Sequence, residues 1–329
     1  MKNIIKKVAA INDLSGFGRS SLTAIIPIIS NMGIQVCPLP TAILSTHTGG
    51  FKNFSFVDFT DNMTDFINHW KALGLNFDCI YSGFLGSSKQ IDIVSDFIDF
   101  FGNDENLVVI DPVMGDDGSL YDTMENDIVS KMKNLIEKAD IITPNFTELC
   151  LLLNKKYKST ISEDEIKQWI FELSKIGPNI IIVTSVPEEK NSSDKFSNVI
   201  AFDKKNNVFW KTKCKLIPTS YPGTGDSFTS VLIGSLLQND PLPIAIEKAT
   251  NFINQCIRSS CKFKYPNREG ILLEKMLPML THPIIENNCE LLKNNIKWKG
   301  GIYKCPLCIN SFFVGSFILL FLKLVLNQL

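Results

Sequence analysis

The sequence has no marked excess of charge of either sign. Its 329 residues include 33 basic and 34 acidic side chains, which gives a formal net charge of -1, and no block of basic residues occurs before the C-terminal tail. Proteins that bind nucleic acid usually present a basic surface, so we expect no nucleic-acid partner and favour small-molecule ligands. With 45% hydrophobic and 20% charged residues, the chain is globular and can bury one large core or two modest ones.

Paired cysteine motifs and a targeting sequence are also missing. Only Cys305 and Cys308 form a CxxC, no second pair follows, and His282 lies far upstream, so a metal site there is not favoured. The N-terminus runs from three lysines straight into a strand-like segment and does not resemble a signal peptide. Six further cysteines are scattered through apolar segments, as expected of reduced thiols in a cytoplasmic protein: Cys37, Cys79, Cys150, Cys214, Cys256 and Cys261.

A dinucleotide-binding GxGxxG is absent from the first glycine-containing loop. The apolar run Val8–Ile11 stops at Asn12-Asp13-Leu14-Ser15-Gly16-Phe17-Gly18, and apolar residues then recur with helical spacing from Leu22 to Ile29. The glycines let a ligand approach the backbone, and Asp13 and Ser15 provide polar contacts. The alternative is that Asp13 is a simple turn residue.

Strand-like and helix-like segments alternate after this loop. Further strands are predicted at 34–44 (broken by two prolines), 79–81, 107–110, 141–142 and 180–183. Helices are predicted at 61–73, 88–101, 128–138, 149–153, 163–176, after Gly225, and at 245–260 and 268–280. Residues 51–59 predict a short lid or edge strand, and 199–202 with 208–210 predict a hairpin. This alternation predicts one doubly wound α/β domain that binds ligands at the carboxyl ends of its strands.

Polar residues follow several of these strands. Asp111 and Asp116 come after a buried run, where they could hold Mg²⁺ through water. Asn145 and Glu148 stand three residues apart at a helix entrance, where they could form a simple cap or point together at a metal-bound phosphate. The remaining polar or aromatic residues at strand ends are His47, Thr48, Phe84, Thr143, Thr184 and Ser185.

The stretch Gly223-Thr224-Gly225-Asp226 precedes an apolar helical run. Free N–H groups and the helix dipole at such a terminus favour an anion. A carboxylate is a poor phosphate ligand, so Asp226 is predicted to be a base that takes a proton from an attacking hydroxyl while the amides hold the transferred group. The alternative is an ordinary capped helix after a Pro-Gly turn.

From Val8 to about Leu280, the order and spacing of these loops resemble the pyridoxal/pyridoxamine (vitamin B6) kinases of the ribokinase-like superfamily. The resemblance implies a three-layer α/β/α sandwich with a mostly parallel sheet and a small lid. It also implies ATP-dependent phosphorylation of the 5′-hydroxymethyl group of pyridoxamine, pyridoxal or pyridoxine in the salvage of pyridoxal 5′-phosphate. Mg²⁺, a monovalent cation such as K⁺, a homodimer and a cytoplasmic location are implied as well.

The resemblance assigns roles by position. Asp226 is the base, and Gly223, Thr224 and Gly225 form the anion hole. On the nucleotide side it places Asp111, Thr143, Asn145, Glu148, Thr184, Ser185 and Gly225, with Asp111 and Glu148 as Mg²⁺ ligands, partly through water. On the substrate side it places Asp13, Ser15, His47, Thr48 and Phe84. Asp13 stands where many pyridoxal kinases have serine, so the choice among the three vitamers stays open.

Two other functions are compatible with these residues. Hydroxymethylpyrimidine kinases of thiamine synthesis also often have an acidic residue in the first loop. A kinase-derived protein that binds a vitamer without turnover is the other alternative, although the intact Gly-Thr-Gly-Asp and Asn-x-x-Glu motifs favour an enzyme.

Residues 281–329 are predicted to be an appendage to a kinase domain of residues 1–280. Within an apolar segment at 306–326, the 17 residues Pro306–Leu322 contain no charge. A spanning helix needs about 17 to 25 apolar residues, so the segment could anchor the protein to a membrane. The alternatives are a helix packed on the domain, an apolar dimer contact, and a translated non-native end.

Overall fold

The computed structural model describes residues 5–125, 127–188, 196–215, 217–281 and 289–293. The chain divides into two compact units, residues 1–294 and 295–329, and all described residues belong to the first. Cys305, Cys308 and the apolar segment 306–326 lie outside the described residues. Within the described ranges, no helix is both long enough and apolar enough to span a bilayer.

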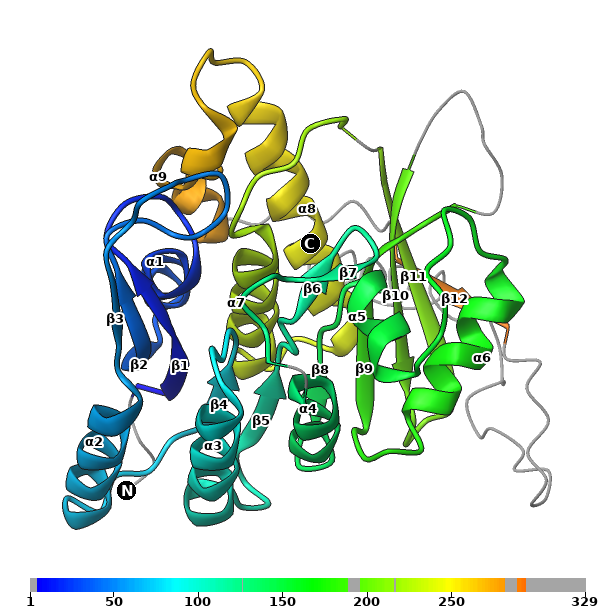
Figure 1. Cartoon of the computed structure of the whole chain (residues 1–329). Helices are drawn as coiled ribbons and strands as arrows, with labels where there is room; N and C mark the ends of the chain where they lie inside the picture. The colour runs from blue at the N-terminus through cyan, green and yellow to red at the C-terminus, as the bar shows by residue number, and fades with distance from the viewer. Residues whose placement is uncertain (1–4, 126, 189–195, 216, 282–288, 294–329) are drawn as a thin grey trace, which may run out of the picture. The chain divides into compact units, whose positions relative to one another are not determined.

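A mixed sheet of ten strands forms the centre of the described unit (Figure 1). Neighbouring strands are parallel from β9 across the sheet to β2. The pairs β9–β10, β10–β11, β11–β12 and β2–β3 are antiparallel. The order across the sheet is β12 (Cys289–Leu292), β11 (Val208–Lys215), β10 (Phe196–Asp203), β9 (Ile180–Val186), β8 (Ile141–Ile142), β5 (Leu107–Ile110), β4 (Cys79–Ser82), β1 (Lys7–Ser15), β2 (Gln35–Leu44) and β3 (Phe56–Asp58).

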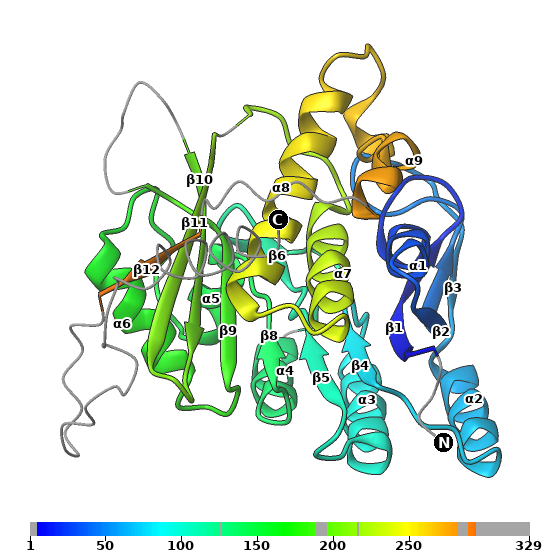
Figure 2. The ribbon, with the colours of Figure 1, turned by 180° about the vertical axis from the view of Figure 1, so that it is seen from behind.

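Helices cover the sheet in two layers, and Figures 1 and 2 show them on both of its sides. One layer packs α1 (Ser21–Asn31) on α7 (Thr224–Leu237) and α7 on α8 (Leu242–Ser260). In the other layer, neighbouring helices pack in chain order: α2 (Thr60–Ala72), α3 (Ser88–Phe101), α4 (Ile128–Ile136), α5 (Phe146–Leu152) and α6 (Glu163–Leu173). This architecture confirms the predicted α/β/α sandwich with a mostly parallel sheet.

The two prolines do not break β2, contrary to the prediction. The N–H of Gln35 donates to the Lys6 carbonyl beside β1, and backbone direction alternates along a strand, so Pro38 and Pro40 turn their nitrogens away from β1. On that far side β3 pairs only with Ala42–Leu44. Because no strand faces the prolines there, their missing N–H groups cost no sheet hydrogen bond.

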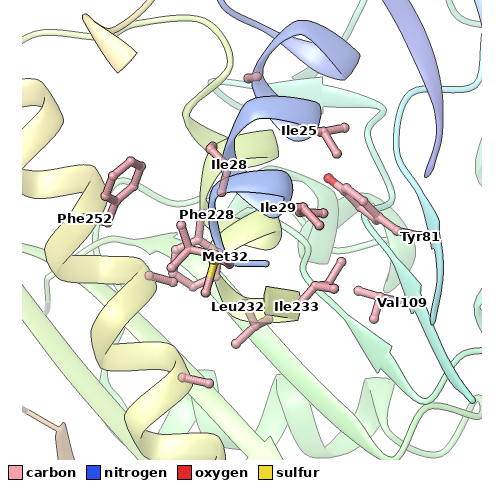
Figure 3. Packing of buried hydrophobic residues seen from close by; sticks show 14 of the residues in the cluster. Ile25, Ile28, Ile29, Met32, Tyr81, Val109, Phe228, Leu232, Ile233 and Phe252 are labelled. Carbon is pink, nitrogen blue, oxygen red and sulfur yellow. The ribbon is translucent and has the colours of Figure 1, made fainter. Parts of the chain in front are cut away.

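The layer of α1, α7 and α8 holds much of the hydrophobic core. Figure 3 shows side chains of all three helices packed together and against the sheet residues Tyr81 and Val109. Burying one large apolar side chain contributes roughly 1.5–3 kcal/mol, so this packing fixes α7 firmly against the sheet. Besides Tyr81 and Val109, the figure labels Met32, which directly follows α1, and the helix residues Ile25, Ile28, Ile29, Phe228, Leu232, Ile233 and Phe252.

In two segments near the end of the described unit, the structure differs from the prediction. The single helix predicted at 268–280 is wrong: η1 (Asn267–Glu269), α9 (Leu273–Met276) and η2 (Leu277–Leu280) replace it. Gly270 interrupts it in the left-handed region with φ +84°, and Pro278 lacks the N–H that would continue α9. Strand β12 comes from beyond residue 280 and pairs with β11, so the sheet continues past the predicted domain boundary.

Smaller elements lie near the carboxyl ends of the strands. Residues 51–59 contain the edge strand β3, one of the two predicted alternatives. A short hairpin of β6 (Gly115–Asp116) and β7 (Ser119–Leu120), which the sequence analysis did not predict, contacts α5. Since the strands from β9 to β2 are parallel, the loops that leave them meet at one edge of the sheet, where the candidate residues lie.

Candidate active site

The N-terminus of α7 presents backbone N–H groups without partners. Gly223 precedes the helix with φ +77° and ψ 5°, and no described side chain caps it. A Cβ at residue 223 would lie 2.1 Å from the Arg19 carbonyl oxygen, so both conformation and space require glycine. The N–H groups of residues 224–226 accordingly form no hydrogen bond within the described structure. Such a terminus suits an anion.

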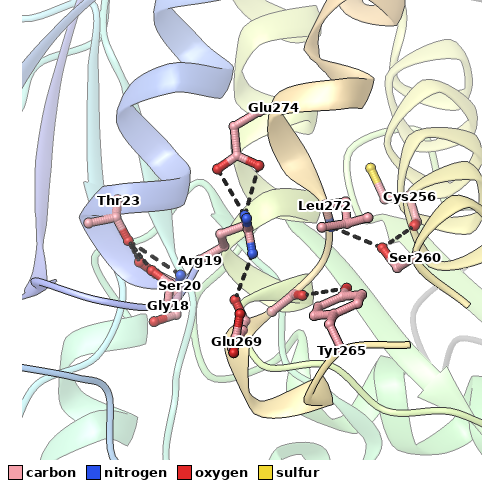
Figure 4. Close-up of polar contacts among 11 residues, drawn as sticks. Gly18, Arg19, Ser20, Thr23, Cys256, Ser260, Tyr265, Glu269, Leu272 and Glu274 are labelled. Carbon is pink, nitrogen blue, oxygen red and sulfur yellow. Dashed lines mark hydrogen bonds and ion pairs between the residues drawn. The ribbon is translucent and has the colours of Figure 1, made fainter. Parts of the chain in front are cut away.

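Arg19 fixes the loop before α1 to the segment around α9 (Figure 4). Its Nε donates to both carboxylate oxygens of Glu274, at 2.9 and 2.8 Å. Its Nη1 and its backbone N–H both donate to the Glu269 carbonyl, at 3.2 and 3.1 Å. These bonds hold the Arg19 carbonyl against Gly223, and so place the N-termini of α1 and α7 side by side.

Asp226 lies in the first turn of α7 and is partly exposed. Its Oδ1 accepts from Asn12 Nδ2 at 3.1 Å, and its Oδ2 accepts from the backbone N–H of Ser21 at 2.8 Å. Burial raises its pKa to about 6, and the Asp13 carboxylate adds to the increase, whereas the donors Ser21 and Asn12 lower the pKa. A carboxylate with a pKa close to neutral is well suited to accept a proton.

Asn12 and Ser21 are two contacts of Asp226 that sequence reasoning missed. Asn12 is fully buried at the end of an apolar strand, and only that position hinted at a role. Ser21 has φ +52°, an uncommon conformation for a residue with a side chain, and nothing in the sequence signalled it. Asn12 lies in β1 and Ser21 is the first residue of α1, so these two consecutive elements hold the candidate base from one side.

Asp13 and Ser15 lie together at the end of β1. Ser15 Oγ donates to Asp13 Oδ2 at 3.1 Å, and both residues are buried. Burial raises the pKa of Asp13, while hydrogen bonds from Ser21 and Ser15 lower it. Because Asp13 also raises the pKa of Asp226, the two carboxylates belong to one electrostatic unit.

The loop after β2 contains His47 and Thr48. His47 Nε2 donates to the Arg268 carbonyl at 2.6 Å, and its Nδ1 accepts from the Gly49 N–H at 3.1 Å. These partners fix the neutral tautomer with hydrogen on Nε2, and burial lowers the pKa of His47. Both ring nitrogens are therefore occupied within the protein. Thr48 is exposed.

Phe84 follows β4 and is half-buried. Its backbone N–H donates to Asn12 Oδ1 at 3.0 Å, and its carbonyl accepts from Thr41 Oγ1 at 3.2 Å. Asn12 thus joins Phe84 to Asp226. The two residues lie 142 positions apart in the chain, so only the fold could bring them together.

Asp111 and Thr143 lie beside the α7 terminus. A Cβ at Gly225 would be 3.9 Å from Asp111 Oδ2. Burial first, and then the Asp226 carboxylate, raise the pKa of Asp111 well above its usual range, while Thr143 and Thr229 donate to it and oppose the increase. The hydroxyls of Thr143 and Thr229 also contact each other at 3.0 Å.

Asn145 and Glu148 form the predicted capping box of α5. Asn145 Oδ1 accepts from the Glu148 N–H at 2.9 Å, and the Asn145 N–H donates to Glu148 Oε2 at 2.8 Å. Glu148 Oε1 accepts from the Met114 N–H at 3.1 Å. Burial and then the Asp111 carboxylate raise the pKa of Glu148 well above its usual range. The cap is therefore present, but its N–H donors do not compensate for the burial of the Glu148 carboxylate.

Thr184 and Ser185 lie within β9, near its carboxyl end, rather than in a loop after it. The N–H of Thr184 donates to the Pro144 carbonyl at 3.0 Å, next to Asn145. Ser185 is exposed and has φ +55°, at an irregularity in the pairing of β9 with β10. Both residues lie, like Asn145, at the edge of the sheet where the parallel strands end.

The donor chemistry of Asp111 and Glu148 fits Mg²⁺. Both are buried carboxylates that repel one another, and neither pairs with a described lysine or arginine. Mg²⁺ prefers oxygen ligands and keeps several waters or phosphate oxygens. Among the described residues, no group of three or more His, Cys, Asp or Glu side chains is placed to hold a metal ion.

The chain is similar to known kinases. The family model for phosphomethylpyrimidine kinase matches residues 12–269. A pyridoxal kinase of Dictyostelium discoideum is 29% identical over 248 residues, which cover 70% of this chain and 79% of that protein.

Solved structures resemble the whole described unit. A "putative phosphomethylpyrimidine kinase" of Bacteroides thetaiotaomicron, in a crystal form with pyridoxal, is 51% identical with a TM-score of 0.84, over 88% of this chain and 100% of that chain. A pyridoxal kinase of Lactobacillus plantarum is 27% identical with a TM-score of 0.75, over 85% and 98%. The chain therefore belongs to the phosphomethylpyrimidine kinase family, as a homologue of the pyridoxal kinases within the ribokinase-like superfamily.

Proposed function

We propose that this protein transfers the terminal phosphoryl group of ATP to the 5′-hydroxymethyl group of a B6 vitamer. One observation carries the proposal: Asp226, a carboxylate with a pKa of about 6, lies in the same helix turn as unpaired N–H groups and interacts electrostatically with the buried carboxylate of Asp111. Phosphoryl transfer needs positioning, charge neutralisation and removal of the hydroxyl proton, and this group of residues offers all three.

Each part of the site has a proposed task. The N–H groups of Thr224 and Gly225 bind the oxygens of the transferred group, with Gly223 leaving room for them. Asp226 takes the proton of the attacking hydroxyl. Asp111 and Glu148 hold Mg²⁺, which when bound neutralises charge on the phosphates.

The other candidate residues divide between the two ligands. Asp13, Ser15, Thr48 and Phe84 contribute to the vitamer pocket, and His47 shapes it by fixing its loop to the Arg268 carbonyl. On the ATP side are Thr143, Asn145, Thr184 and Ser185. The positions of the residues support this division. The first group lies at or after the carboxyl ends of β1, β2 and β4, and the second lies at or after those of β8 and β9.

A second candidate substrate is hydroxymethylpyrimidine. The description of the matching family model favours it, and so does Asp13, an acidic residue in the first loop. Both substrates are hydroxymethylated heteroaromatic rings, so the same base and anion site would serve either one.

We also propose that the enzyme needs a monovalent cation such as K⁺, forms a homodimer and acts in the cytoplasm, with the tail segment 306–326 as a candidate membrane anchor. The resemblance of the loops supports the first three proposals, and the uncharged stretch supports the fourth. Replacing K⁺ by tetramethylammonium in the assay and measuring the mass by light scattering test the first two.

A coupled ATP assay on the purified full chain tests the function. Pyridoxal, pyridoxine, pyridoxamine and hydroxymethylpyrimidine are compared at equal concentration, and we expect turnover of at least one vitamer with a higher kcat/KM than that of the pyrimidine. Faster turnover of hydroxymethylpyrimidine than of every vitamer would replace the proposal by the second candidate. Binding of pyridoxal without ADP formation would instead identify a non-catalytic vitamer-binding protein.

A further inference from the structure

Asn12 is a polar side chain with no exposed surface, at the point where the pairing of β1 with β2 becomes irregular. A buried amide is costly unless its hydrogen-bonding groups are satisfied. The three hydrogen bonds of the Asn12 side chain offset that cost, and all of them lie at the candidate active site.

The orientation of the Asn12 amide is fixed. Its Oδ1 accepts two backbone N–H groups, from Asp13 at 2.9 Å and from Phe84 at 3.0 Å. A flipped amide would place its NH₂ group against both donors. Nδ2 must therefore point the other way, and there it donates to Asp226 Oδ1 at 3.1 Å.

The chain leaves room for this arrangement at Gly83. A Cβ at residue 83 would lie 2.2 Å from Asn12 Nδ2 and 2.9 Å from its Cγ. Any larger residue would displace the amide or the β4 loop.

We propose that Asn12 is a positioning residue for the phosphoryl-transfer reaction: it orients the Asp226 carboxylate and keeps it ionised, and it links this base to the loop that carries Phe84. The inference rests on the proposed function of Asp226. A donor to a carboxylate favours the charged form, so the loss of Asn12 would leave the base protonated over a wider pH range. A carboxylate oxygen has more than one lone pair, so Oδ1 can accept from Asn12 and still take up a proton.

Other titratable groups also face Asp226, and the test must separate their effects from that of Asn12. They are Asp13 at the end of β1, His47 after β2, Tyr81 on β4, Asp111 after β5 and Tyr121 after β7. None of them is replaced by a substitution at residue 12, so a shift in the titration of Asp226 in Asn12→Leu reports the lost donor, and a shift in Asn12→Asp reports the lost donor together with the added carboxyl.

Two variants and one matched control make the test. Asn12→Leu removes the donor and keeps the number and branching of the side-chain heavy atoms, and Asn12→Asp places a second carboxyl against Asp226. Thr41→Val is the control, because Thr41 is also fully buried and donates to the Phe84 carbonyl but does not contact Asp226. The measurements are the pH profile of kcat/KM and the ¹³C carboxyl titration of Asp226 in the ligand-free protein, assigned from its absence in Asp226→Asn.

We expect the acid limb of the profile, and the Asp226 titration, to move up by about one pH unit in Asn12→Leu and by at least as much in Asn12→Asp, with no movement in Thr41→Val. An unmoved titration in either folded Asn12 variant overturns the inference, and so does an equal movement in Thr41→Val. If the wild-type protein has no kinase activity, the proposed function fails, but the carboxyl titration still decides the role of Asn12.

Discussion

Replacing Asp226 by asparagine should abolish most activity and at the same time stabilise the folded protein. Without a carboxylate to accept the hydroxyl proton, kcat should fall by about 10²–10⁴-fold, the usual contribution of a general base, with little change in the KM for ATP. A simple helix cap would behave differently, because asparagine caps a helix about as well as aspartate does.

The expected gain in stability follows from the raised pKa. Moving the pKa of Asp226 from 3.8 to about 6 on folding means that the ionised carboxylate destabilises the native state by about 3 kcal/mol. Asparagine removes this cost but brings its NH₂ group against the fixed NH₂ group of Asn12, and so loses one hydrogen bond worth about 1 kcal/mol. The net gain should be about 2 kcal/mol.

The sign of the pH dependence is specific. Below pH 3.8, Asp226 is protonated in both the folded and the unfolded chain, so its burial costs nothing there. The cost appears as the pH rises above 3.8 and is complete above about 6. The free energy of unfolding of the variant should therefore be slightly below that of the wild type near pH 4, equal to it at about pH 4.5, and clearly above it from about pH 6.

Urea unfolding at pH 4.5, 6 and 7.5, followed by tryptophan fluorescence, measures the difference, and a coupled assay gives kcat. Asp65→Asn, at an exposed position on α2, is the matched control and should change neither quantity. More than about a tenth of wild-type kcat in Asp226→Asn would refute the base assignment. A stability difference that does not depend on pH would refute the electrostatic reasoning.

Four further predictions can be tested, three at residues of the described site and one in the tail segment 306–326, which is based on the sequence. Asp13→Ser should shift relative kcat/KM toward pyridoxal, because a carboxylate can pair with the cationic amine of pyridoxamine and a hydroxyl cannot do so with comparable strength; an unchanged ratio among the three vitamers would remove Asp13 from the ring pocket. Glu148→Gln should lose activity mainly at low Mg²⁺ and regain part of it as Mg²⁺ is raised, whereas the loss in Asp226→Asn should not respond to Mg²⁺. Gly223→Ala should lower the free energy of unfolding by about 1–3 kcal/mol, since φ is +77° and the new Cβ would lie 2.1 Å from the Arg19 oxygen; a melting temperature equal to that of the wild type contradicts this. If segment 306–326 is a membrane anchor, the full chain should sediment with membranes and need detergent for release, and its recovery in the high-speed supernatant excludes the anchor.

Local elements and motifs of this protein could be predicted from the amino-acid sequence without the structure. Apolar runs such as Leu107–Ile110 are short, continuous and bounded by polar residues, so a buried parallel strand could be predicted from the chain alone. The capping box of Asn145 and Glu148 is also local, because its two residues stand on one helix turn. The helical spacing of the apolar residues after Gly225 identified the helix entrance, because this spacing is also a local property of the chain.

Which of these residues act on one another depends on the folded chain and could not be predicted from local patterns. The path of β2 through two prolines depends on how far its neighbour β3 extends, and the interruption at Gly270 depends on a left-handed turn within a pattern that looks helical. The contacts of Asp226 with Asn12 and Ser21 span more than 200 residues, and the raised pKa of Asp226 comes from burial and from Asp13. Desolvation and charge repulsion depend on distances in space, so no local pattern of the sequence could predict them.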